Sequence, residues 1–108
     1  MLQRTKIKAL LAAEAPLGEV LVKGWVRTRR DAKDFSFIEL NDGSSLKNIQ
    51  VIANNNLNNY EDVKKLSTGS SVAVTGDMVA SQGGSQKFEI VAKDILIYDI
   101  ADDDYPLQ

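Results

Sequence analysis

The sequence contains no cysteine and no histidine among its 108 residues. Disulfides, thiolate zinc sites and cysteine nucleophiles are therefore excluded, and so is the commonest general base. There is also no apolar run of about 18 residues and no charged-then-apolar leader at the start, which disfavours membrane spanning and secretion. We therefore expect a cytoplasmic protein with no membrane partner, in which carboxylates, lysine, tyrosine, serine and threonine remain for chemistry.

The chain carries little net charge, −2 at pH 7, but its charges are unevenly distributed. Residues 1–33 contain eight cations and three anions, whereas residues 34–108 contain five cations and twelve anions. Such a chain can present a local cationic patch to a polyanion although its average is acidic. The alternative is that the charges mix in three dimensions, and composition does not decide between the two.

The residues from Gly24 to Gln50 combine a cluster of cations, two phenylalanines one residue apart, a glycine-containing turn and a glutamine. Single-stranded nucleic acid requires this mixture, because cations attract phosphates, aromatic rings stack on bases and amides read base edges. Ordinary β-sheets contain the same residue types. The position of these residues in the fold must therefore decide between the two interpretations.

Hydrophobic periodicity predicts a helix near the start of the chain and then a strand. Ile7, Leu10 and Leu11 have helical spacing, with Thr5 as the expected N-cap and Pro16 and Gly18 ending the helix. From Glu19 the period changes to two, which indicates a strand with a valine face directed inward and Gly24 at a bend, bulge or close backbone approach. The expected inward residues are Val20, Val22, Gly24, Val26 and Thr28, and the expected outward residues are Leu21, Lys23, Trp25, Arg27 and Arg29.

A hairpin is predicted next, from strands at 35–40 and 48–53 joined by an Asn-Asp-Gly turn. Its outer face should carry Phe37 and Gln50. A short helix is expected over 60–66, with Asn59 as N-cap and Gly69 as its stop. Strands follow at 71–78 and 86–98, joined by a flexible loop at 81–85, and Phe88 and Glu89 should lie on opposite sides of the last strand.

This order of elements, with a helix between the third and fourth of five antiparallel strands, predicts an all-β, five-stranded Greek-key barrel of the OB-fold type. We expect three segments: a helical extension at 1–18, the barrel at 19–99 and an acidic linker at 100–108. Oligonucleotides bind such barrels across strands 2 and 3 and at the loops after strands 1 and 4, which here are 29–34 and 81–85. Phe37, Gln50 and the cationic cluster map to that surface.

Several stretches resemble one family. GWVRTRRDAKDFSFIELNDGS, NIQVI, TGSSVAVTGDMVASQGGSQKFEI and the terminal YPLQ are similar to the anticodon-binding domain of bacterial asparaginyl-tRNA synthetases. GWV followed by Arg-Arg-Asp is shared with aspartyl enzymes, and a lysyl enzyme is a weaker alternative. A free-standing OB-fold module that binds another protein is the alternative from a different class.

The resemblance implies a binding role for four residues. Phe37 would stack on the central uridine of an anticodon that reads guanine, uridine, uridine, and Gln50 would hydrogen-bond the edge of that uridine. Glu89 would contact the anticodon from the last strand, and Arg30 would lie against backbone or base at the mouth of the groove. From their charge, Arg27, Arg29 and Lys33 are possible phosphate contacts, although a run of charges is usually only a solvated face.

The resemblance also implies a parent enzyme, which would join asparagine to tRNA(Asn) with ATP and magnesium in a separate catalytic domain and would form a homodimer mainly through that domain. This chain has no phosphate-cradling glycine-rich loop and no acid and base pair in an enclosed site. We therefore expect no catalytic, cofactor-binding or metal-binding residue in it. By itself it should bind the anticodon loop of tRNA(Asn) without catalysing a reaction.

Overall fold

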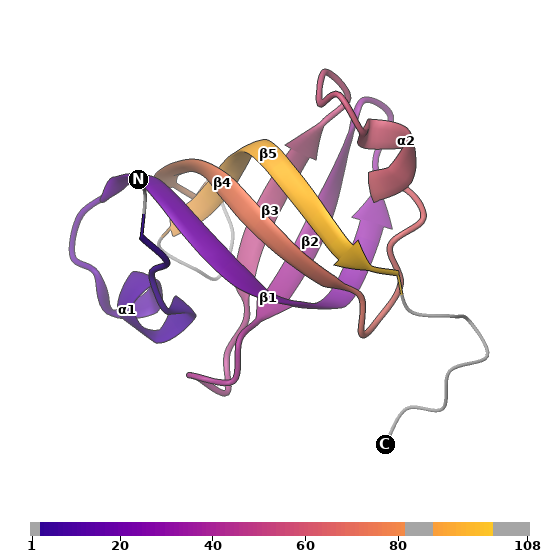
Figure 1. The fold of residues 1–108 in the computed structure, drawn as a ribbon. Helices are drawn as coiled ribbons and strands as arrows, with labels where there is room; N and C mark the ends of the chain where they lie inside the picture. The colour runs from indigo at the N-terminus through magenta and orange to yellow at the C-terminus, as the bar shows by residue number, and fades with distance from the viewer. Residues whose placement is uncertain (1–2, 82–87, 101–108) are drawn as a thin grey trace.

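The computed structural model describes residues 3–81 and 88–100. Five strands form one closed barrel in the order β1-β2-β3-β5-β4, with two short helices outside it (Figure 1). The OB-fold barrel predicted from the order of elements is confirmed. The elements are α1 (Ile7–Ala12), β1 (Gly18–Asp31), β2 (Phe35–Asn41), β3 (Ile49–Asn54), α2 (Tyr60–Val63), β4 (Ser71–Ala80) and β5 (Phe88–Asp99).

Strand β1 closes the barrel because its two halves belong to two different pairings. Residues from Gly18 to Trp25 pair antiparallel with β4, and residues from Trp25 to Asp31 pair antiparallel with β2. Gly24 lies where the partner changes, and a Cβ there would approach the Asn41 carbonyl oxygen to 2.4 Å. The close backbone approach predicted at Gly24 is therefore confirmed, and no larger residue fits without moving the backbone.

A β-bulge at Arg27 changes the alternation of β1. Val26 pairs with Leu40 and Thr28 pairs with Glu39, so Arg27 is an extra residue on β1. The loop after α2 holds this bulge, because the Gly69 N–H and the Thr68 hydroxyl donate to the carbonyls of Val26 and Arg27.

The bulge explains where the predicted inward and outward faces of β1 are correct and where they are wrong. Val20, Val22 and Val26 are buried as predicted. The prediction is wrong beyond the bulge, where Thr28 turns outward and Arg29 lies opposite the buried Ile38.

The interior of the barrel is filled by aliphatic side chains from every strand. The inward set of the β2–β3 hairpin is buried as its period of two predicts, and α1 adds Ile7 and Leu10 at one end. Fully buried members include Val22, Val26, Ile38, Leu40, Ile49, Val51, Val74, Ile90 and Ile95. Burying each such side chain contributes about 1.5–3 kcal/mol, so this packing supplies the rigidity on which any surface site depends.

Helix α1 is held by the loop between β2 and β3. The Ile7 N–H donates to Asp42 Oδ2 at 3.0 Å, and the Lys8 N–H donates to Ser44 Oγ at 3.0 Å. The Thr5 cap predicted from sequence is wrong, because Lys6 holds the N-cap position without a side-chain bond and partners 35 and 36 residues away satisfy the amides. Burial opposes ionisation of Asp42, but hydrogen bonds from Ser44 and the Ile7 N–H keep its pKa below 3.8.

Helix α2 is a single turn, shorter than the predicted 60–66. Asn59 precedes it but makes no capping bond, since its side-chain amide donates to the Ile95 carbonyl at 2.8 Å and so ties the helix to β5. Gly69 has a positive φ of 97°, yet it lies in the following loop and does not terminate the helix. Asn59 is therefore at the N-cap position as predicted, but its capping bond and the stop at Gly69 are not formed, because Asn59 bonds to β5 and Gly69 bonds to β1.

The predicted loop at 81–85 and linker at 100–108 lie almost entirely outside the described residues, as does the predicted start of the last strand at 86. The division into an extension, a barrel and a linker stays a prediction. Within the described parts of the chain, no helix is long and apolar enough to cross a membrane.

Candidate nucleic-acid interface

The predicted site residues come together in rows across the outer surface of the barrel. Arg30 on β1 pairs with Phe37 on β2, and Phe37 pairs with Ile52 on β3. Ile52 in turn lies opposite Val91, because β3 and β5 run parallel. One row thus crosses four strands. Gln50 and Glu89 lie beside this row, and we call the surface formed by Arg30, Phe37, Gln50, Ile52 and Glu89 the base-reading surface, after the role proposed for it below.

The bulge at Arg27 determines whether Arg30 can belong to this surface. In an unbroken strand, Arg30 would lie on the same face as the buried Val26, four residues earlier. The extra residue reverses that parity, and Arg30 becomes the outward partner of Phe37. Its guanidinium carbon lies 4.9 Å from the centre of the Phe37 ring, a cation–π contact.

Phe37 is half-buried and has an aromatic neighbour on its own strand. The rings of Phe35 and Phe37 meet edge to face, with centroids 4.9 Å apart and planes at 79°. Such a contact restricts the ring that a base would stack on. The sequence therefore predicted correctly that Phe37 lies on the outer face, and Phe35 acts as its support.

Gln50 and Glu89 lie side by side on β3 and β5. Gln50 Nε2 donates to Glu89 Oε1 at 3.1 Å, and the Ser81 hydroxyl donates to the same oxygen at 3.2 Å. Glu89 is only 4% exposed, so its carboxylate is a buried acceptor held by two donors. Phe88 and Ile90 belong to the core, while the bond to Gln50 places Glu89 on the opposite side of β5, as the predicted alternation expects; alternation did not show that Glu89 would be buried as well.

Ser81 was not singled out from the sequence. In the sequence, the only sign of a role for Ser81 is its position in the loop that is expected to border the binding groove. The residue becomes informative once the barrel shows that the end of β4 and the start of β5 pair, with Ala80 opposite Phe88. Its hydroxyl then lies within hydrogen-bond distance of a buried carboxylate eight residues later.

A second row lies beside the first. Thr28 pairs with Glu39, and its hydroxyl donates to Glu39 Oε1 at 2.8 Å. Glu39 pairs in turn with Gln50. Polar side chains therefore continue from β1 to β5 next to the row that contains Phe37. This is expected for a surface that combines stacking with hydrogen bonding.

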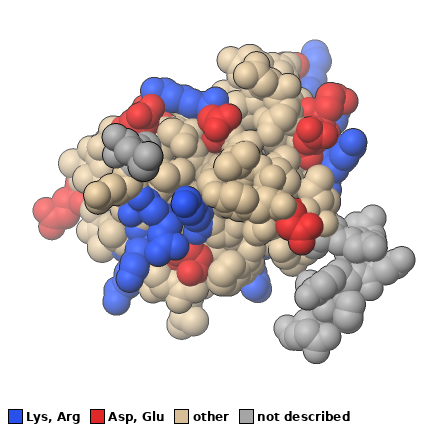
Figure 2. Space-filling model, viewed as in Figure 1, with Lys and Arg blue, Asp and Glu red and all other residues tan. Residues whose placement is uncertain are grey.

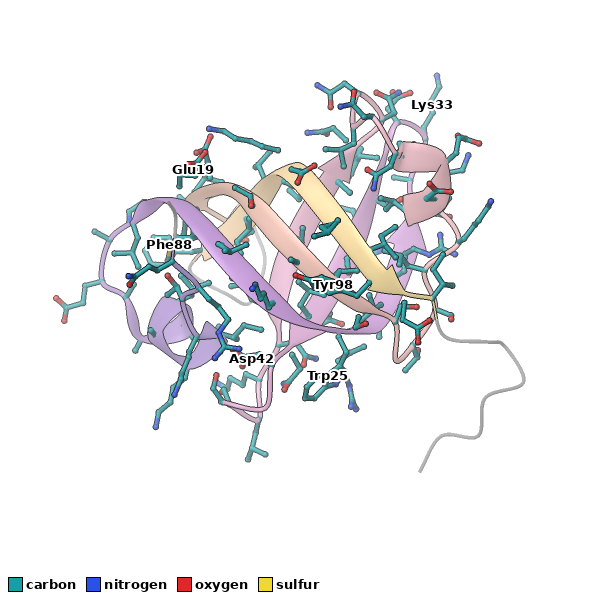
Figure 3. The ribbon with its side chains drawn as sticks, viewed as in Figure 1. Glu19, Trp25, Lys33, Asp42, Phe88 and Tyr98 are labelled. Carbon is teal, nitrogen blue, oxygen red and sulfur yellow. The ribbon has the colours of Figure 1, made fainter. Side chains whose placement is uncertain are left out.

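The three cations expected to attract phosphates differ in their surroundings. Arg29 is engaged within the protein, since its Nε donates to the Leu66 carbonyl at 2.7 Å and its Nη1 pairs with Asp31. Arg27 is exposed at the bulge and borders a hollow of about 330 Å³ beside the β2–β3 loop. Lys33 is exposed in the turn between β1 and β2, at the top of the view in Figure 3.

Asp31 organises the turn that carries Lys33. It accepts hydrogen bonds from Arg29 and from the Ser36 hydroxyl, and Ser36 also lies 3.1 Å from the Tyr60 hydroxyl. The bond from Arg29 and then that from Ser36 hold the pKa of Asp31 below 3.8. The end of β1 is thereby fixed to β2 and to α2.

Other cations gather near α1. Arg4 and Lys6 line a hollow of about 280 Å³ with Asp42, Gly43 and Ser44. Figure 2 shows a blue cluster around a red group at the place where Figure 3 labels Asp42. Part of the N-terminal excess of positive charge is thus a local patch on this face, which favours the first of the two charge distributions considered above.

Comparisons with known proteins identify the family of the chain. A family model described as an OB-fold nucleic acid binding domain, named tRNA anti-codon, matches residues 20–98. The asparagine–tRNA ligase of Geotalea uraniireducens is 46% identical over 108 residues, covering 100% of this chain and 23% of the relative. That of Desulfotalea psychrophila is 51% identical over 107 residues, covering 97% of this chain and 24% of the relative.

Among solved structures, asparaginyl-tRNA synthetase from Pyrococcus horikoshii, complexed with asparaginyl-adenylate, superimposes with a TM-score of 0.83. It is 21% identical, with 100% of this chain and 25% of that chain covered, so it shows the shared fold. The chain thus spans about a quarter of the length of the relatives that it matches. The resemblance identified in the sequence is confirmed.

Proposed function

The chain belongs to the tRNA anticodon family of OB-fold nucleic acid binding domains, and we propose that it is the anticodon-recognition domain of an asparaginyl-tRNA synthetase. One observation carries the proposal beyond the family. An outward aromatic ring, Phe37, lies on the strand next to an amide, Gln50, that is bonded to a buried carboxylate. This arrangement suits an unstacked base, which needs a ring for its face and fixed polar groups for its edge.

In this proposal the central uridine of the anticodon stacks on Phe37. Base stacking on an aromatic side chain contributes about 1–3 kcal/mol and accepts any base. Selection of uridine over other bases must therefore come from hydrogen bonds to the edge of the base. Uridine presents an N–H donor between two carbonyl acceptors, and Gln50 with Glu89 supplies amide and carboxylate groups to match them. A wrong base that leaves one of these buried groups unpaired costs about 1–3 kcal/mol.

The role of Glu89 is to orient Gln50 as well as to accept from a base. Its Oε1 accepts from Gln50 and from Ser81, so the amide is positioned before RNA arrives. A preorganised amide loses less side-chain entropy on binding than a mobile one. Arg30, over the Phe37 ring, contributes positive charge where the phosphate backbone passes.

The remainder of the enzyme lies outside this chain. We infer a parent protein that joins asparagine to tRNA(Asn), binds ATP and magnesium in its catalytic domain, and acts in the cytoplasm as a homodimer. The 108-residue chain itself supplies recognition of the anticodon loop and no chemical step. The names of the curated relatives and the share of their length that this chain spans support this division.

The test is a titration of the chain with two anticodon stem-loops at a fixed low salt concentration. One carries guanine, uridine and uridine, and in the other cytidine replaces the central uridine. We expect the replacement to weaken binding about 5- to 150-fold, corresponding to about 1–3 kcal/mol. Equal affinity for the two RNAs would show that the central base is not read.

Two controls separate the alternatives. Gln50→Ala should bind both stem-loops with similarly weak affinity, because discrimination requires the amide. A third stem-loop with cytidine in place of the last uridine distinguishes an asparaginyl from an aspartyl domain, since only the asparaginyl domain should bind it more weakly. If the chain served only as a protein-binding module, none of these RNAs would change the NMR resonances of Phe37, Gln50 or Glu89.

A further inference from the structure

The outside of the barrel carries a group of large apolar side chains that the base-reading surface does not include. Trp25 on β1 is 38% exposed, and Leu96 and Tyr98 on β5 are 53% and 56% exposed. Single exposed apolar residues are common in soluble proteins, but contiguous ones usually mark an interaction site.

Strand β4 lies between these side chains and carries only small residues there. Trp25 pairs with Ser71, while Ala73 pairs with Lys23 on one side and Leu96 on the other. Because Val72 and Val74 point into the core, Ser71 and Ala73 lie on the outer side of β4. We call the surface of Trp25, Ser71, Ala73, Leu96 and Tyr98 the apolar face, in which Ala73 is only 6% exposed and forms the floor.

The apolar face occupies one end of a sheet surface whose other end is charged. There Lys93 pairs with Glu19 at 3.1 Å and with Asp77 at 3.3 Å. Figure 3 places Trp25 and Tyr98 on the same side of the barrel. Charged residues also border the apolar group directly, since Lys23 pairs with Ala73 and Asp99 pairs with Ser71. The apolar group therefore has a polar boundary, as protein interfaces do.

The apolar face does not overlap the base-reading surface. The latter uses Glu89 at the start of β5, whereas the former uses Leu96 and Tyr98 near its end. Seven residues of extended strand separate Glu89 from Leu96, which is about 23 Å. RNA bound beside Glu89 can therefore be accommodated while another molecule covers Leu96 and Tyr98.

We propose that the apolar face docks the catalytic domain of the parent synthetase, an inference that rests on the proposed function. The chain accounts for only 23% of the length of its relative from Geotalea uraniireducens, so about three quarters of such an enzyme remain to contact it. Tyr98 and Ile100 lie at the end of β5, and Ile100 is itself 39% exposed. The described part of the chain thus ends beside the apolar face.

The expected counterpart is an apolar surface with hydrogen-bond acceptors at its edge. Trp25 and Tyr98 each combine a large apolar body with one polar hydrogen, so an interface that covers them must satisfy the indole N–H and the phenol O–H. Docking would also fix the angle between the RNA-binding barrel and the catalytic domain. The contact would then position the acceptor end of a bound tRNA relative to the catalytic site.

The test compares the solvent accessibility of side chains by hydroxyl-radical footprinting with mass spectrometry. The 108-residue chain is measured alone and as a chimera, in which it replaces the matching segment of the Geotalea uraniireducens ligase. We expect oxidation of Trp25, Leu96 and Tyr98 to fall about threefold or more in the chimera, because interface cores lose most of their contact with water. Leu46, fully exposed on the β2–β3 loop, is the internal reference and should not change.

A variant and an RNA titration complete the design. Leu96→Lys in the chimera should restore oxidation of Trp25 while leaving the affinity for the cognate stem-loop within twofold of the original, about 0.4 kcal/mol. If the chimera does not fold, the catalytic segment of the same ligase is added separately to the chain, and protection of Trp25 should rise with its concentration.

Three results would overturn the docking proposal. These are equal oxidation of Trp25 in both proteins, protection that appears only when RNA is added, and protection in the isolated chain that increases with its own concentration. The second would make the apolar face an RNA contact, and the third would make it a contact between two copies. Base discrimination by the stem-loops is measured separately, so failure of docking and failure of anticodon recognition are distinguishable.

Discussion

The base-reading surface and the apolar face lie on the same barrel and share β1 and β5, yet they are built differently. On the base-reading surface the side chains contact one another: Arg30 covers Phe37, and Gln50 donates to Glu89. On the apolar face the principal feature is area, supplied by Trp25 and Tyr98 around small residues of β4. The base-reading surface consists of side chains held in fixed orientations, whereas the apolar face consists of exposed apolar area.

This difference follows from what each surface is proposed to bind. A base is small, and selecting it requires a few polar groups whose directions are fixed in advance. A protein domain is large, and burial of apolar area contributes most of the free energy of its association. The two surfaces should consequently respond to substitution in different assays.

The largest effect is expected at Gly24, which underlies both surfaces. In Gly24→Ala the added Cβ would lie 2.4 Å from the Asn41 carbonyl oxygen, so the backbone of β1 or β2 must move. We expect a loss of about 3 kcal/mol in the free energy of unfolding, at the upper end of overpacking costs. Chemical denaturation checks this, with Ala73→Gly as a control that makes the reverse change, removing one methyl group, on the outer side of β4. Unchanged stability would show that the approach of β1 and β2 tolerates a methyl group.

The next largest effect is expected at Phe37 and should be confined to RNA binding. Phe37→Ala removes the stacking ring, so affinity for the cognate stem-loop should fall by about 1–3 kcal/mol. Isothermal titration calorimetry measures the loss, and Leu96→Ala is the matched control from the apolar face. If Leu96→Ala weakened binding as much as Phe37→Ala, the separation of the two surfaces would be wrong.

A smaller effect on RNA affinity is expected at Arg30. Arg30→Gln removes a cation while keeping an amide of similar length, so the expected loss is about 0.5–1 kcal/mol at moderate salt. The slope of log K against log salt concentration should become shallower by about one phosphate contact. Arg29→Gln is the matched control, because Arg29 is bonded to Leu66 and Asp31 and should leave that slope unchanged. An unaltered slope in Arg30→Gln would assign the phosphate contact to other cations.

A pH dependence of stability is expected from Asp31, at the end of β1. Its pKa is held below 3.8 by hydrogen bonds from Arg29 and Ser36, so its contribution is fully present above that pH and is lost as pH falls through the lowered value. NMR titration of the Asp31 carboxyl carbon measures the pKa directly. Ser36→Ala should raise that pKa toward 3.8, and no change would mean that Ser36 does not stabilise the carboxylate.

The smallest effect is expected on the apolar face of the isolated chain. Leu96 is more than half exposed, so Leu96→Lys should change the free energy of unfolding by no more than about 0.5 kcal/mol. Thermal denaturation of the chain alone provides the measurement. A large destabilisation would mean that Leu96 packs within the barrel and is not available for a partner.

The fold could be predicted from sequence to the extent that it depends on local patterns. The period of two in β1 to β3 identified Val22, Ile38 and Val51 as core residues, and the position of the interposed helix indicated the barrel. The bulge at Arg27 could not be predicted, because the bonds that hold it come from Thr68 and Gly69, about forty residues later.

The candidate site shows the same limit. Phe37 and Gln50 were assigned to the outer face from alternation alone, since both lie in a regular hairpin. The assignment of Glu89 and Arg30 came from the resemblance to a family. Alternation places Glu89 on the outer face without showing that it is buried. The pairing of β3 with β5 explains its burial, and no short stretch of sequence contains both strands.

The parallel pairing of β3 with β5 also has a consequence for the order in which activity appears during synthesis. Gln50 and Glu89 are 39 residues apart, and β5 leaves the ribosome after the other four strands of the barrel. The hairpin that carries Phe37 can form while β5 is still being made, but its amide then has no carboxylate to orient it. A nascent or truncated chain would stack on any base without discriminating between bases. Selectivity for one base would therefore be acquired only by the complete barrel.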